Sequence, residues 1–105
     1  MKGKYFAAGS VVVLYLLDPP GKVWGVLRSL DATGVAVEGI DLRSFDETLR
    51  GLLAGEIQAH DLSLAFYPLS RVEKILLDRG TEAAPSLEDQ FRKRVGMSLA
   101  EFLSR

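Results

Sequence analysis

The chain has 105 residues, a length typical of one domain, with 48% hydrophobic and 26% charged residues. This composition excludes disordered and fibrous proteins, and the formal net charge of -1 excludes a chain-wide positive field that would attract nucleic acid. The absence of cysteine excludes disulfides, thiolate metal sites and cysteine nucleophiles. It also fits a reducing compartment, so we expect a cytoplasmic protein.

An apolar run at residues 11–17 follows Lys2 and Lys4, which raises the alternative of a secretory signal peptide. In a signal peptide, small residues follow the apolar run and mark the cleavage site. Here the small residues 7–10 precede the run, and a turn sequence, residues 18–21, follows it. The run is also shorter than the roughly 20 residues of a membrane-spanning helix. The pattern therefore predicts a β-strand covered on both faces, with no membrane segment.

Two further strands are predicted at residues 23–30 and 35–40, joined by turn signals at residues 18–21 and 31–34. Gly25 lies inside the first of them, where a missing side chain allows a strand to coil tightly. Three short consecutive strands of this kind are how a small antiparallel barrel begins.

An amphipathic helix is predicted at residues 44–55, because four apolar residues recur there with helical spacing. Ser44 and Glu47 form a capping-box pair at its start, and Gly55 is a natural stop. A fourth strand at residues 62–67 and a fifth at residues 72–77 follow, separated by a break at Pro68.

The tail, residues 85–105, is predicted to form two helices with capping pairs Ser86–Asp89 and Ser98–Glu101. Their apolar sides require a surface to dock on, either the barrel or a neighbouring subunit. The sequence thus predicts a single, mainly β domain. Its core is a five-stranded antiparallel small barrel at residues 11–78, with an inserted helix between strands three and four and a C-terminal helical tail.

The pattern Gly25-x-Leu27-x-x-Leu30-Asp31 is similar to the first signature of the Sm-like (LSm or Hfq-type) small β-barrel family. The segment Phe66-Tyr67-Pro68, followed by Val72 and Ile75, is similar to the second half of that fold. The chain resembles a divergent, bacterial-type member of the family over residues 11–78, and this resemblance implies a barrel of the Sm-like or SH3-like kind. The resemblance implies a ring of identical subunits joined through strand edges, with RNA as the expected partner.

Two positions depart from the family pattern. Val35 stands where Sm proteins have an asparagine that takes part in base recognition, and a valine side chain cannot hydrogen-bond a base edge. Arg71 is followed by Val72, whereas the family's second signature has an Arg-Gly pair. The resemblance therefore supports the barrel and the ring more than it supports the family's uridine pocket.

Within this resemblance, three residues are the candidates for a ligand or RNA contact: Arg71, Tyr67 and Arg28. Arg71 is the best of these, because Sm-like barrels bring the turn before the last strand near the pore, although an inter-subunit salt bridge would explain it equally well. Four residues of the last two strands are the candidates for the subunit interface: Phe66, Val72, Ile75 and Leu77.

His60 beside Asp61 is the only histidine, and the pair could act as an oriented general base. No nucleophile or metal motif accompanies it, so we interpret His60 as a loop residue. Carboxylates such as Asp41, Asp46 and Glu47 lack the spacing of a calcium loop. We therefore predict no catalytic residue, no metal, no cofactor and no small-molecule substrate.

Three other features have a structural and a functional interpretation. Residues 18–22 could cradle an anion, but a turn is favoured because proline removes amide donors. The cluster Arg92-Lys93-Arg94 could touch nucleic acid, but a solvated helix end is favoured. Trp24, Tyr15 and Tyr67 could form a base-stacking platform, but core rings are commoner.

These observations favour a non-catalytic, Sm-like oligomeric ring protein, for which RNA or protein is the candidate ligand. The alternative left open is a structural or protein-interaction module without nucleic-acid binding.

Overall fold

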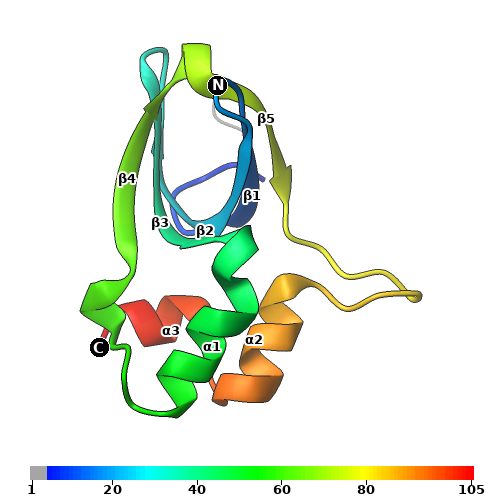
Figure 1. The fold of residues 1–105 in the computed structure, drawn as a ribbon. Helices are drawn as coiled ribbons and strands as arrows, with labels where there is room; N and C mark the ends of the chain where they lie inside the picture. Colours follow the sequence, from blue (N-terminus) through cyan, green and yellow to red (C-terminus); the bar gives the residue numbers. More distant parts are fainter. Residues whose placement is uncertain (1–4) are drawn as a thin grey trace.

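The computed structural model describes residues 5–105 and contains one five-stranded antiparallel sheet (Figure 1). Its strands are β1 (Val11–Leu16), β2 (Gly21–Leu30), β3 (Gly34–Asp41), β4 (Ser63–Pro68) and β5 (Val72–Leu77), in the order β4-β3-β2-β1-β5. All five predicted strands are thus confirmed to within two residues at each end. The predicted strand in the apolar run is β1, which covers residues 11–16.

The three predicted helices are also present: α1 (Phe45–Leu53), α2 (Leu87–Val95) and α3 (Leu99–Leu103). Three short 3-10 turns are also present: η1 (Leu42–Ser44) precedes α1, η2 (Ala59–Asp61) precedes β4, and η3 (Leu69–Arg71) joins β4 to β5. Both tail helices begin at the predicted capping boxes, whereas Ser44 makes no capping hydrogen bond in α1. No helix among residues 5–105 is long and apolar enough to cross a membrane.

The sheet separates two apolar clusters. The inner cluster, inside the curled sheet, is formed by alternate residues of the first three strands: Val12, Leu14, Leu16, Leu27, Val35 and Val37. The outer cluster joins the other face of the sheet to the helices: Trp24, Val26 and Ile40 contact Phe45, Leu49, Phe91 and Leu99. The helices lie together on one side of the sheet (Figure 1). The tail therefore docks on the sheet of its own chain.

Asp78, just after β5, attaches the tail to the sheet. Its carboxylate accepts hydrogen bonds from the backbone N–H groups of Leu87 and Glu88, at 3.0 and 2.7 Å, at the start of α2. The same carboxylate accepts a 2.9 Å bond from Nε1 of the buried Trp24 on β2. A negative charge at a helix N-terminus is stabilising, so this single carboxylate holds α2, β2 and the end of β5 together.

Gly25 and Gly39 face each other across β2 and β3. A Cβ atom at Gly39 would overlap the carbonyl oxygen of Trp24 and lie 2.5 Å from the Cα of Gly25. The two glycines therefore allow the strands to approach closely, in the strand where the sequence predicted tight coiling. The sheet curls but does not close, because β4 and β5 are its two ends and neither pairs with the other.

Candidate functional site

The outer edge of β4 is the first candidate surface. This strand pairs only with β3, so its other edge has no backbone partner among residues 5–105. Leu64 and Phe66 lie on the same face of the strand and are 65% and 56% exposed. β4 has no charged residue and no bulge in its pairing with β3, although Pro68 ends it. Exposed, flat and apolar strand edges of this kind are sites of strand pairing with another chain.

The edge of β5 is the opposite margin of the sheet. This strand pairs only with β1. Beside it, Tyr5 and Phe6 from the N-terminal segment and Leu76 from β5 line an open hollow of about 320 Å³, and all three side chains are exposed. Arg79 borders the hollow, with its guanidinium 5.4 Å from the centroid of the Tyr5 ring. Both margins of the sheet therefore carry exposed apolar side chains.

The predicted interface residues divide between the two faces of the sheet. Phe66 points outward at the edge of β4. Val72, Ile75 and Leu77 are partly buried and pack against the inner cluster. The sequence did not indicate four other exposed residues at the margins, because alternation alone does not tell which face of an edge strand is covered. These residues are Leu64, Leu76, Tyr5 and Phe6.

The three predicted RNA-contact residues all interact within the chain. The guanidinium of Arg71 donates to the carbonyl oxygens of Leu17 and Pro19, the latter at 3.2 Å, and so ties η3 to the β1–β2 turn. Arg28 forms a salt bridge with Glu38 at 2.8 Å. Tyr67 is partly buried against the inner cluster. The structure does not gather these three side chains at one unoccupied surface.

The signature aspartate, Asp31, shapes the β2–β3 turn. Its Oδ1 accepts hydrogen bonds from the hydroxyl and N–H of Thr33, at 2.6 and 2.8 Å, and from the N–H of Gly34 at 3.3 Å. The hydrogen bond from the Thr33 hydroxyl, followed by those from the two amides, holds the pKa of Asp31 below its ordinary value. Val35, next along the chain, is fully buried. This turn therefore offers no base-reading side chain at the position where Sm proteins have asparagine.

His60 lies in η2 with its side chain 81% exposed and its Nε2 3.5 Å from a carboxylate oxygen of Asp61. An exposed pair of this kind has no enclosed cavity in which to act on a substrate. Within residues 5–105, no group of three or more His, Asp or Glu side chains is arranged to hold a metal ion.

The basic cluster on α2 is partly used within the fold. Arg94 bonds Asp46 of α1 at 2.9 Å, and Arg92 lies 3.4 Å from Glu88 one turn earlier. Only Lys93 has no carboxylate partner in the described part of the chain. Trp24 is fully buried between Phe45 and Phe91, with centroid distances of 5.4 and 5.5 Å, so it is a core ring and cannot form a stacking platform.

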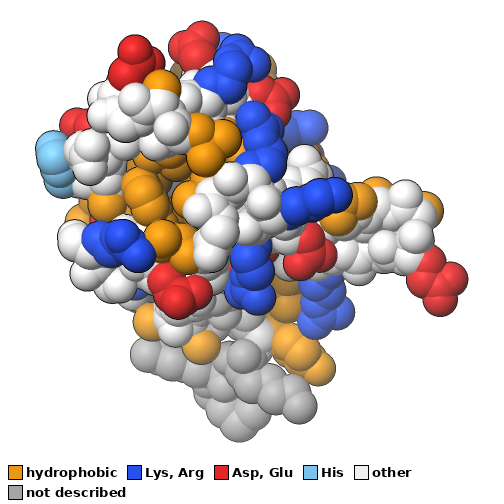
Figure 2. Space-filling model, turned by 90° about the horizontal axis from the view of Figure 1, so that it is seen from below, with side chains coloured by type: hydrophobic (Ala, Val, Ile, Leu, Met, Phe, Trp, Pro, Cys, Tyr) orange, Lys and Arg blue, Asp and Glu red, His pale blue; other side chains and the backbone are white. Residues whose placement is uncertain are grey.

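The helical side of the molecule, seen from below in Figure 2, also exposes apolar side chains, framed by charged ones. Leu53 of α1 is 57% exposed, and Leu52, Phe102 and Leu103 are partly buried there. These residues belong to helices, so this surface lacks the free strand edge of the two margins.

Comparisons of this chain with protein-family models, with curated proteins and with solved structures found no match.

Proposed function

We propose that the chain is a non-catalytic subunit of a homo-oligomer of the Sm-like kind, in which copies join through the margins of their sheets. The observation that carries the proposal is the pair of unpaired edges at β4 and β5, both with exposed apolar side chains. Because these margins differ from each other, β4 of one copy would pair with β5 of the next. Such head-to-tail contacts produce a closed ring when the rotation between subunits allows closure.

Self-assembly satisfies two physical requirements at once. Pairing β4 with β5 gives hydrogen-bond partners to the backbone groups of both edges. It also brings Leu64 and Phe66 beside the hollow lined by Tyr5, Phe6 and Leu76, where apolar area is removed from water. Of the two alternatives, we favour a structural or protein-interaction module over an RNA-binding ring. The reason is that the three predicted RNA-contact residues interact within the chain.

We expect Phe66→Asp and Leu76→Asp each to reduce the molar mass of the protein toward that of a monomer. Each change places a charge on one margin, where it must be desolvated if a neighbouring strand pairs there. Size-exclusion chromatography with light scattering measures the mass. Because both side chains are exposed, the thermal unfolding midpoint of an isolated subunit should stay close to that of other surface variants.

Leu53→Asp is the matched control, since Leu53 is as exposed as Phe66 but lies on α1, away from both margins. An oligomer that persists in Phe66→Asp and Leu76→Asp, or that dissociates equally in Leu53→Asp, would contradict assembly through the margins. Val72→Asp or Ile75→Asp is not a clean test, because these side chains pack against the inner cluster.

RNA binding is tested separately, by filter binding of U-rich and A-rich single strands over a series of salt concentrations. We expect no salt-sensitive binding in the micromolar range, because Arg71 and Arg28 are engaged within the chain and Val35 is buried. Binding that weakens steeply with salt, and that Arg71→Ala removes, would instead support an RNA-binding ring.

A further inference from the structure

A row of three side chains crosses the sheet on its outer face, next to the helices. Tyr15 of β1 pairs with Lys22 of β2 on one side and with Lys74 of β5 on the other. The ammonium groups lie 5.0 and 4.7 Å from the centroid of the Tyr15 ring, respectively. Each lysine therefore makes a cation–π contact with the same ring.

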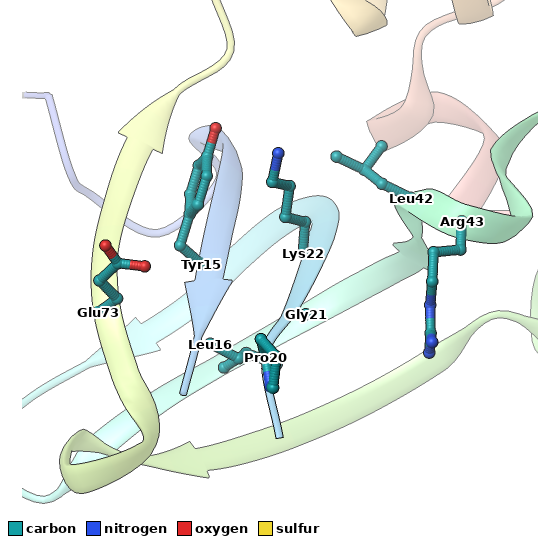
Figure 3. Close-up of a pocket in the computed structure, with 8 residues that line it drawn as sticks. All are labelled: Tyr15, Leu16, Pro20, Gly21, Lys22, Leu42, Arg43 and Glu73. Carbon is teal, nitrogen blue, oxygen red and sulfur yellow. The ribbon is translucent and has the colours of Figure 1, made fainter. Parts of the chain in front are cut away.

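The row borders an open cavity of about 540 Å³ between the β1–β2 turn and η1. Figure 3 shows Tyr15 and Lys22 standing on the sheet side by side, with Leu42 beyond Lys22 and Glu73 on the far side of Tyr15. Leu16, Pro20 and Leu42 supply apolar walls. A volume of this size lies within the range of about 300–1,000 Å³ that is usual for small-molecule sites.

The charged groups at the cavity differ in whether they are already paired. Arg43 is neutralised by Asp41, to which it donates hydrogen bonds at 3.0 and 3.3 Å. The side-chain hydrogen bond from Arg43 also holds the pKa of Asp41 below its ordinary value. Across residues 5–105, by contrast, no oppositely charged group lies within 4.0 Å of Lys22, Lys74 or Glu73.

The bulge in β5 explains the position of Glu73. The pairing of β1 with β5 shifts between Tyr15 and Leu16, so that Glu73 falls between the paired residues Val72 and Lys74. A bulge turns a side chain away from its normal alternation, and here Glu73 lines the same cavity as Lys22. Charges of both signs thus face one cavity without neutralising each other.

We propose that this cavity binds a small zwitterion of the α-amino-acid type with an apolar side chain. Lys22 and the Tyr15 hydroxyl hold its carboxylate, Glu73 holds its ammonium group, and Leu42 and Pro20 contact its side chain. A ligand with a single negative charge would meet Glu73 with repulsion, whereas a zwitterion satisfies both signs. Tyr15 and Lys22 lie on strands inside the sheet, and Glu73 lies on the edge strand β5.

The test is to titrate the full chain with L-leucine and with two analogues, while the NMR signals of Tyr15 report binding. N-acetyl-L-leucine lacks the ammonium charge, and L-leucinamide lacks the carboxylate. We expect saturable binding of leucine and about tenfold weaker binding of each analogue, since each loses one charge-assisted contact.

Variants assign the two ends of the ligand. Lys22→Met should weaken binding of leucine and of N-acetyl-leucine but not of leucinamide. Glu73→Gln should weaken the binding of leucine and of leucinamide but not the binding of N-acetyl-leucine. Lys93→Met, which removes an unpaired lysine from α2, is the control and should leave every affinity unchanged. Absence of saturable shifts with leucine, or equal effects of Lys22→Met and Lys93→Met, would overturn the inference.

Discussion

Trp24→Ala is expected to lower the free energy of unfolding by about 3–5 kcal/mol, the usual cost of truncating a buried tryptophan. Trp24 is fully buried at the junction of the sheet with α1 and α2. Its truncation leaves a cavity beside Phe45 and Phe91 and removes the indole donor to Asp78. Since domains of this size have total stabilities of about 5–15 kcal/mol, the variant should be close to unfolding at 37 °C. Urea denaturation followed by circular dichroism measures the loss.

Two further variants separate packing from hydrogen bonding at this position. Trp24→Phe lacks the N–H that donates to Asp78 but keeps an aromatic ring in the outer cluster. Because the ring is kept, the free energy of unfolding should fall clearly less than in Trp24→Ala. Asp78→Ala keeps the ring but removes the acceptor of two α2 amides and of the indole. A Trp24→Ala variant as stable as the wild type would show that the helices do not depend on this junction.

Gly39→Ala should also lower the free energy of unfolding strongly, by about 1–3 kcal/mol or more. This is the range found when extra atoms are forced into a packed core. A methyl group at this position would overlap the backbone of Trp24 and Gly25 on the facing strand, and backbone atoms cannot rotate away as a side chain can. β2 and β3 must then separate, and this separation weakens their ladder and the contact of Trp24 with the helices.

Gly21→Ala in β2 is the matched control, because its added methyl group would meet only Leu16 Cδ1 at 3.9 Å. Urea midpoints of the two variants should differ clearly, with Gly21→Ala near the wild type. Equal midpoints would show that the close approach of β2 and β3 is not required by the fold.

The course of the chain could be predicted because local signals agree with the fold. The turns at residues 18–21 and 31–34, the helical spacing after Ser44 and the capping boxes at Ser86 and Ser98 are all local, and each marks the start or end of an element. Gly25 was predicted as a point of tight coiling, but the matching role of Gly39 needs the β2–β3 register.

The candidate sites depend on register and could not be predicted in the same way. Val72 and Ile75 were predicted at a subunit interface because they lie on an edge strand, but their packing against the inner cluster depends on the register with β1. Arg71 appeared available for a ligand because its targets, the carbonyl groups of Leu17 and Pro19, are more than 50 residues distant in sequence. The Lys22–Tyr15–Lys74 row likewise exists only once three strands are aligned.

Central to the proposed function is self-assembly, in which the free margins of the sheet join copies of this chain. Sedimentation velocity of the wild-type protein over a concentration series tests it most directly. We predict a main species whose mass is an integral multiple of 11.5 kDa, with Phe66→Asp shifting it to the single-chain mass. A wild-type protein that sediments as an 11.5 kDa monomer at every concentration would contradict the claim.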